Sequence, residues 1–138
     1  CTLRRFCGIY VMKLLLDTHT FLWFIDDNPR LSSTAQNLLE SEVDLLLSIA
    51  SLWEITIKVG LGKLTLPVPF HSFIQQHIIH NEIELLPIQL EHLETLVTLP
   101  FYHRDPFDRL LAVQALAEEI RLVSADPIFD KYGVTRLW

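Results

Sequence analysis

The stretch KLLLDT, residues 13–18, places a short apolar run directly before a carboxylate. Three successive leucines are too few for a helix and suit a strand that is buried on both faces of a sheet. Asp17 follows this run, so its carboxylate stands where the predicted strand ends. The rest of the chain alternates similar short apolar runs with longer helical patterns.

The order of these patterns predicts an α/β fold. Strand-like runs cover residues 13–16, 43–48, 83–86 and 122–124, with a last strand near Val134. Helical patterns cover residues 19–25, 32–40, 51–60, 70–80, 90–98 and 106–119, with Ser32, Ser51 and Asp105 as N-caps. Strands separated by helices indicate βαβ units and a central, mostly parallel sheet that helices cover on both faces.

Length and composition describe a single ordered domain. The chain has 138 residues, half of them hydrophobic and a fifth charged. Its formal net charge of −6 argues against a protein that coats duplex nucleic acid. The charge argues less against a nuclease, because bound metal ions neutralise the acids that hold them. The two cysteines, both near the N-terminus, form neither a disulfide framework nor a zinc site, which favours a reducing compartment.

The first eleven residues, CTLRRFCGIYV, precede the pattern that is typical of a domain. We expect residues 12–138 to form the domain and residues 1–11 to be an upstream extension or a remnant of cloning. Lys13 and Asp17 interrupt any signal-peptide pattern, and no apolar run approaches the length of a membrane span. The expectation is therefore a cytoplasmic protein with no membrane association.

Carboxylates recur where the predicted strands end. Asp17 and Asp126 follow strands, Glu54 lies one turn into the helix after the second strand, and Asp108 lies in the first turn of another helix. If the strands are parallel, all four reach one edge of the sheet. Such a cluster of like charges is costly unless a cation is bound or protons are shared. Oxygen ligands without matched histidines or cysteines favour Mg²⁺ or Mn²⁺ over Zn²⁺.

Each of these acids also has a structural explanation. Asp17 and Asp126 can cap the helical turns that follow them, and Asp105 suits an N-cap position. Asp108 falls at the third helical position, where a carboxylate stabilises the free amides. Glu54 is the hardest to explain structurally, because its helix is mostly apolar and a carboxylate there needs a partner. The inference of a site therefore depends on the whole set.

Four phrases of the sequence resemble one family. They are LLLDTHTFLW (14–23), SLWEITIKVGLGKL (51–64), HRDPFDRLLAVQA (103–115) and LVSADPIFDKYGV (122–134). In this order they resemble PIN-domain proteins, and most closely the VapC-type toxins of bacterial toxin–antitoxin pairs. The resemblance spans residues 12–138. It implies a three-layer α/β/α fold and a Mg²⁺- or Mn²⁺-dependent endoribonuclease that hydrolyses RNA phosphodiester bonds.

The resemblance also implies roles for individual residues. The positions that match the family's catalytic and metal-binding acids are Asp17, Glu54, Asp108 and Asp126. Asp105 matches a further acid of the HRDPFDR-like subgroup and is an additional candidate ligand. Thr18 and Ser124 stand where the family often has hydroxyl residues near the site, and both are candidate substrate-binding residues. The implied partners are an RNA substrate, a cognate antitoxin and a second copy of the chain in a homodimer.

Basic side chains near the acid motifs are candidates for phosphate contacts. They are Lys58, Lys63, Arg104 and Arg109. An equally good explanation is solvated surface charge, or a salt bridge from one of the arginines to the site carboxylates. His103 is a candidate for contact with the substrate, but a lone histidine in a predicted loop is more often incidental than functional.

Two other functions compete with a nuclease. A non-catalytic RNA-binding module could keep the fold without the chemistry, although the intact acid set disfavours it. Receiver domains and phosphatases also carry acids at the ends of parallel strands. They need an acidic pair with a lysine, or an Asp-x-Asp motif after the first strand, whereas this chain has DTHT there and its second acid inside a helix.

Overall fold

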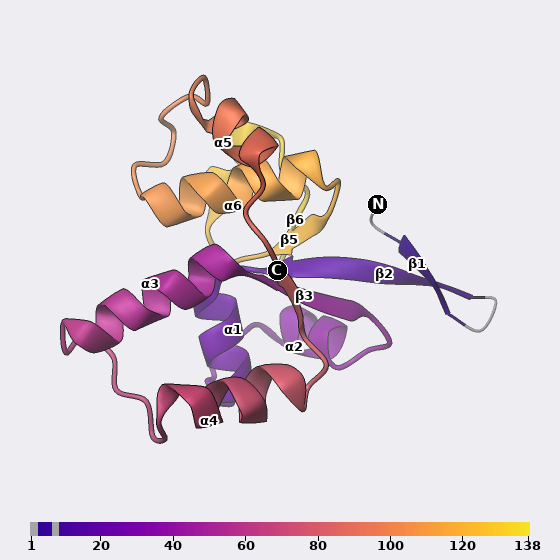
Figure 1. Ribbon diagram of the computed structural model, residues 1–138. Coiled ribbons are helices and arrows are strands. Elements are labelled where there is room, and N and C mark those ends of the chain that lie inside the picture. The colour runs from indigo at the N-terminus through magenta and orange to yellow at the C-terminus, as the bar shows by residue number, and fades with distance from the viewer. Residues whose placement is uncertain (1–2, 7–8) are drawn as a thin grey trace.

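The computed structural model describes residues 3–6 and 9–138, and its side chains from Met12 onward (Figure 1). The centre is a parallel sheet with strand order β4–β3–β2–β5–β6. The strands are β2 (Ile9–Leu16), β3 (Asp44–Ser48), β4 (Glu84–Leu86), β5 (Arg121–Val123) and β6 (Arg136–Leu137). The predicted parallel sheet is confirmed, although its last strand begins two residues after Val134.

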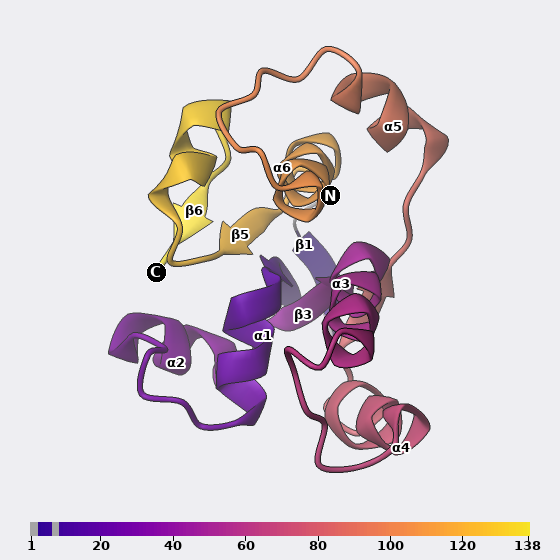
Figure 2. The same ribbon diagram turned by 90° about the vertical axis from the view of Figure 1, so that its left-hand side faces the viewer.

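Helices cover both faces of this sheet, which gives the predicted three-layer α/β/α fold (Figures 1 and 2). One layer contains α1 (Thr18–Ile25), α2 (Ser33–Leu39), α3 (Ile49–Gly60), α4 (Phe70–Ile74) and the π-helical turn η1 (Gln75–Ile79). The other contains α5 (Leu90–Leu96), α6 (Pro106–Ala117) and the 3₁₀ helix η2 (Pro127–Tyr132).

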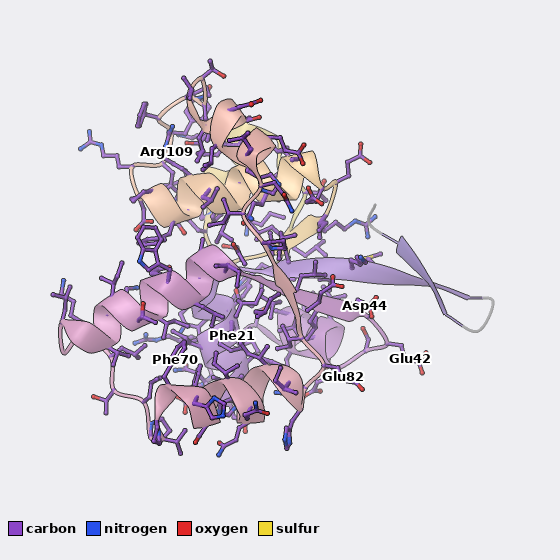
Figure 3. All side chains as sticks on the ribbon, viewed as in Figure 1. Phe21, Glu42, Asp44, Phe70, Glu82 and Arg109 are labelled. Carbon is purple, nitrogen blue, oxygen red and sulfur yellow. The ribbon has the colours of Figure 1, made fainter. Side chains whose placement is uncertain are left out.

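The alternation of side chains along β2 divides the apolar core into two parts. Leu14 and Leu16 pack with Phe21 and the layer of α1 to α4, whereas Leu15 packs with Leu111 and the layer of α6. All five side chains are fully buried. Figure 3 shows Phe21 in the first of these layers. The leucine run at residues 14–16 therefore serves both faces, as expected for a central parallel strand.

Polar caps fix where the helices begin. Ser32 caps α2 and Asp105 caps α6, as predicted. The prediction of Ser51 as a cap is wrong. Ser48 caps α3 instead, since its Oγ accepts a hydrogen bond of 3.0 Å from the amide of Ala50. Ser51 lies inside the helix and is buried, which makes it available for the site described below.

At its N-terminal end, β2 continues beyond the parallel sheet and pairs with the antiparallel strand β1 (Leu3–Phe6), as Figure 1 shows. The register pairs Leu3 with Met12 and Phe6 with Ile9. The predicted domain start at Met12 stays a prediction, and residues 1, 2, 7 and 8 lie outside the described part of the chain. Among the described helices, none has the length and apolar character needed to span a membrane.

Candidate active site

The four predicted acids lie at the carboxyl edge of the parallel sheet. Asp17 directly follows β2, Glu54 is in α3 after β3, and Asp126 is three residues beyond the end of β5. Asp108 comes from the first turn of α6. Four elements that are distant in sequence thus each supply one carboxylate, and the contacts below connect them.

Asp17 is held by two donors. It is buried; its Oδ1 accepts 2.7 Å from the amide of Thr20, and its Oδ2 accepts 2.5 Å from the hydroxyl of Ser124. The first bond makes Asp17 the N-cap of α1, which is its predicted structural role. The second ties it to the end of β5. The carboxylate therefore has one orientation, fixed before any ligand binds.

Glu54 is buried on α3 and has a partner at each carboxylate oxygen. Oε1 accepts a hydrogen bond of 2.7 Å from the Thr18 hydroxyl, which also lies 2.9 Å from the Ser51 hydroxyl. Oε2 lies 2.9 Å from Nζ of Lys58, one turn further along the helix. These contacts are the partners that a carboxylate in an apolar helix requires.

Asp108 carries the electrostatic cost of the cluster. Burial, and after it the charge of Asp105, raises the pKa of its carboxyl from 3.8 to about 7; Asp17 and Glu54 contribute smaller increases, and His103 opposes them. Asp105 caps α6 through Oδ1, which accepts from the amides of Phe107 (2.8 Å) and Asp108 (3.1 Å). Negative charges therefore converge on Asp108, an arrangement that a cation would relieve.

The imidazole of His103 lies between the carboxylates of Asp126 and Asp108 and contacts both. Nε2 of His103 lies 2.7 Å from Oδ2 of Asp126 and 3.2 Å from Oδ2 of Asp108. The backbone amide of Ile128 donates a hydrogen bond to Oδ1 of Asp126 and orients its carboxylate. The backbone amide of Asp126 donates a hydrogen bond of 3.1 Å to the Ser124 hydroxyl. Ser124 thus contacts both Asp17 and Asp126, and it joins the two ends of the site.

The incidental role that the sequence favoured for His103 is wrong, because its imidazole contacts two of the site carboxylates. Only its place at the head of the HRDPFDR phrase pointed to the site, because the loop that carries it has no periodicity that predicts a direction. The contact with Asp126 spans 23 residues and exists only after β5 and α6 have packed together.

Comparisons with known proteins fit this geometry. A model of the PIN domain matches residues 14–134, which covers most of the chain. The chain belongs to the PIN-domain family. It is 30% identical over 114 residues to Ribonuclease VapC22 of Mycobacterium tuberculosis (strain ATCC 25618 / H37Rv), covering 82% of this chain and 86% of that protein. The predicted resemblance to PIN-domain proteins of the VapC type is confirmed.

Solved structures share the PIN fold at lower identity. FitAcB from Neisseria gonorrhoeae has a TM-score of 0.68 at 18% identity and covers 91% of this chain and 96% of its own. VapBC2 from Rickettsia felis, bound to a DNA fragment from its promoter, has a TM-score of 0.64 at 18% identity, with coverage of 91% and 98%. At this identity the likeness shows the fold alone.

The basic residues of this PIN domain differ in where they lie. Lys58 pairs with Glu54 at the site, and Arg104 and Lys63 are exposed. Arg109 is buried, and its guanidinium donates to the carbonyls of Pro100, Leu99 and Leu96 at 2.9, 3.1 and 3.4 Å.

The opposite side of the Arg109 guanidinium is also occupied, because it lies 3.7 Å from the centre of the Phe101 ring. Both terminal nitrogens and one face of the guanidinium are thus in contact with the end of α5 and the loop that precedes α6. These contacts favour a structural role for Arg109 over the substrate contact, surface charge or acid salt bridge considered from the sequence.

Proposed function

We propose that this chain is a divalent-metal-dependent endoribonuclease that hydrolyses RNA phosphodiester bonds, and that it is the toxin of a VapBC-type toxin–antitoxin pair. The observation that carries the proposal is the convergence of four carboxylates at one sheet edge, where burial and neighbouring acids raise the pKa of Asp108 to about 7. The same activity is supported by the relative that is named a ribonuclease and is 30% identical to this chain over 114 residues.

The donor set fits a hard cation. In the proposal, Asp17, Glu54, Asp108 and Asp126 hold Mg²⁺ or Mn²⁺ through carboxylate oxygens, directly or through water. Asp105 keeps Oδ2 available as a further donor, since its Oδ1 caps α6. Bound metal would supply an activated water and charge stabilisation at the leaving oxygen.

The surrounding residues keep these carboxylates in place. Ser124 orients Asp17 and Thr18 orients Glu54. Because both hydroxyls are buried and already bonded to site carboxylates, we assign them a positioning role beside the substrate contact expected from the sequence. Misdirected carboxylate oxygens would weaken the hold on the cation without unfolding the protein.

RNA phosphates would meet basic side chains at the rim of the site. Lys58 is a third exposed and pairs with Glu54 on the side of α3 that faces the cluster. Arg104 is exposed in the loop before α6 and is free to turn toward a phosphate. These two residues supply local positive charge on a chain whose net charge is −6.

Partners and location follow from the proposed toxin role. We propose a cognate antitoxin, a homodimer and a cytoplasmic location. Solved toxin–antitoxin complexes among the relatives of similar fold support the antitoxin. Exposed apolar side chains on α3 and its end, among them Trp53 at 58% and Leu61 at 65% exposure, offer surface for such contacts.

Cleavage of a panel of single-stranded and structured RNAs tests this function, with Mg²⁺, Mn²⁺ or EDTA, beside Asp17→Asn. The proposal predicts cutting that requires metal and disappears in the variant. A folded, metal-binding wild type that binds RNA but cuts none would support the non-catalytic RNA-binding module instead.

A further inference from the structure

His103 is held rigidly although it lies in a loop. Its backbone amide donates 2.9 Å to the hydroxyl of Tyr132, and that hydroxyl donates 2.7 Å to the carbonyl of Pro100. Its ring packs on Phe129, with ring centroids 5.6 Å apart. Both supporting aromatic residues come from η2, the helix that Asp126 caps. These contacts hold the imidazole in a fixed position facing the site, and 14% of the His103 side chain is exposed.

The position of Nε2 is that of a ligand in a shared coordination sphere. Neighbouring ligands in an octahedron of metal–ligand distance about 2.1 Å lie about 3 Å apart. Nε2 is 2.7 Å from Oδ2 of Asp126 and 3.2 Å from Oδ2 of Asp108. The three ligand atoms also lie within 4.8 Å of one another, as a single ion between them requires.

We propose that Nε2 of His103 is a ligand of the divalent ion held by Asp108 and Asp126, which places one nitrogen among the oxygens of the site. This inference rests on the proposed metal centre and sharpens its selectivity. Imidazole suits transition metals, whereas Mg²⁺ prefers oxygen donors and water. The site should therefore prefer Mn²⁺ to Mg²⁺, which revises the argument from an all-oxygen ligand set.

A second cluster of similar composition does not support the same inference. Glu91, His92 and Glu118 also bring three ligand atoms within 4.8 Å of one another. The tautomer of His92 is fixed, however: Nδ1 accepts from the amide of Gln89 at 2.9 Å, so Nε2 carries the ring proton and donates it to Glu118 at 3.2 Å instead of offering a lone pair to an ion. His92 is fully buried and joins α5 to α6, so its contacts have a structural explanation.

Pulsed electron paramagnetic resonance of the Mn²⁺-loaded protein tests the proposal directly, because it detects a nitrogen nucleus bound to the ion. We expect a histidine nitrogen coupling in the wild type, its loss in His103→Gln, and its retention in His19→Gln. His19 is a matched control, since it lies two residues from Asp17 but is exposed and stacked on Trp23. Labelling with heavy-isotope histidine identifies the coupling in the wild type without any variant.

The outcomes separate this inference from the proposed metal centre. Bound Mn²⁺ with no histidine coupling would overturn the role of His103 and leave the carboxylate site standing. A wild type that binds no Mn²⁺ would overturn both. As a second readout, the ratio of Mn²⁺ to Mg²⁺ affinity should fall at least about tenfold in His103→Gln and stay unchanged in His19→Gln. An unchanged ratio in both variants would contradict the proposal.

Discussion

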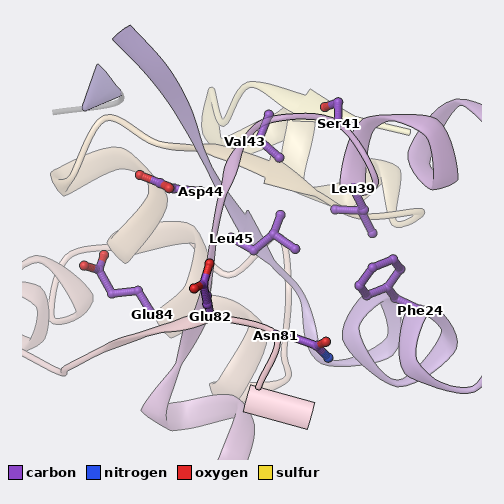
Figure 4. Close-up of a pocket in the computed structure, with 9 residues that line it drawn as sticks. All are labelled: Phe24, Leu39, Ser41, Val43, Asp44, Leu45, Asn81, Glu82 and Glu84. Atoms are coloured by element: carbon purple, nitrogen blue, oxygen red, sulfur yellow. The ribbon is translucent and has the colours of Figure 1, made fainter. Parts of the chain in front are cut away.

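Acidic side chains gather at both ends of the parallel sheet, but the two groups differ in how the fold holds them. At the amino-terminal end, Asp44, Glu82 and Glu84 line a pocket beside the starts of β3 and β4 (Figure 4). Glu82 and Glu84 are exposed, and Glu84 has a loose contact of 3.7 Å with Lys13. At the carboxyl edge, the acids are buried or half-buried and are oriented by amides and hydroxyls.

Neither a pocket nor a count of acids is therefore enough to identify the site. Exposed carboxylates are hydrated and can turn apart, so their mutual repulsion is small. At the carboxyl edge, hydrogen bonds from backbone amides and from the Ser124 and Thr18 hydroxyls hold the carboxylates in place, so they cannot turn apart. At the carboxyl edge the electrostatic cost is concentrated on Asp108, and substitutions that remove acids from the two ends should have very different effects.

The largest difference should appear in catalysis. Asp17→Asn removes a fixed carboxylate from the proposed metal site and should reduce RNA cleavage at least about a thousandfold. Asp44→Asn removes an acid at the opposite end and should change cleavage less than about twofold. Initial rates with Mn²⁺ at matched protein concentrations check the pair. Equal losses in the two variants would remove the distinction between the two ends.

Removing the carboxylate of Asp108 should increase the stability of the protein, although this residue belongs to the proposed metal site. The pKa of its carboxyl is 3.8 in the unfolded chain and about 7 in the folded protein. The contribution of the protonated carboxyl to stability is therefore fully present below pH 3.8 and is lost as the pH rises through 7. Asp108→Asn should therefore raise the free energy of unfolding of the metal-free protein at about pH 8, by up to about 4 kcal/mol.

Urea unfolding in EDTA at about pH 8 and pH 4 measures this effect. The gain should be present at the higher pH and nearly absent at the lower one, while Glu82→Gln should stay within about 0.5 kcal/mol of wild type at both. A loss of stability in Asp108→Asn at the higher pH would show that the acids are held without repulsion.

Arg109 should matter for the fold and not for substrate. Arg109→Met leaves the carbonyls of Leu96 and Leu99 without this donor and should destabilise the protein by about 2 to 3 kcal/mol. Cleavage per folded molecule should change less than about twofold. Wild-type stability together with weakened RNA binding would instead support the phosphate contact considered from the sequence.

A smaller effect is expected at Ser124, which orients Asp17 without being an acid. Ser124→Ala removes the hydroxyl at 2.5 Å from Oδ2 and should lower cleavage by about 10- to 100-fold. The matched change at the other end of the sheet is Ser41→Ala, which removes a hydroxyl that donates to the carbonyl of Leu38 in an exposed turn. Metal titration of cleavage rates should show a raised metal requirement in Ser124→Ala alone.

Much of the fold could be predicted from local patterns. The leucine run before Asp17 and the Asp105-Pro106 helix start each depend on neighbours in sequence. The convergence of Asp17, Glu54 and Asp126 could be expected from parallel strands, whose carboxyl ends share an edge.

Other features arise only in the tertiary structure. The inward direction of His103 depends on Tyr132, and the burial of Arg109 depends on the loop carbonyls around it. No periodicity of the sequence encodes either contact. The sequence did not identify the cap of α3, because Ser48 and Ser51 are both good capping residues. The strand β3 extends to Ser48 and α3 begins at the next residue, so Ser48 occupies the cap position.

Calorimetric titration of Mn²⁺ into metal-free protein, with two double variants beside the wild type, tests whether the metal centre lies at the carboxyl edge of the sheet. Asp17→Asn with Asp108→Asn should weaken binding at least about a hundredfold. Asp44→Asn with Glu82→Gln removes the same formal charge from the other end of the sheet and should bind as the wild type does. Wild-type affinity in the first double variant, or its loss in the second, would contradict a metal centre at the carboxyl edge.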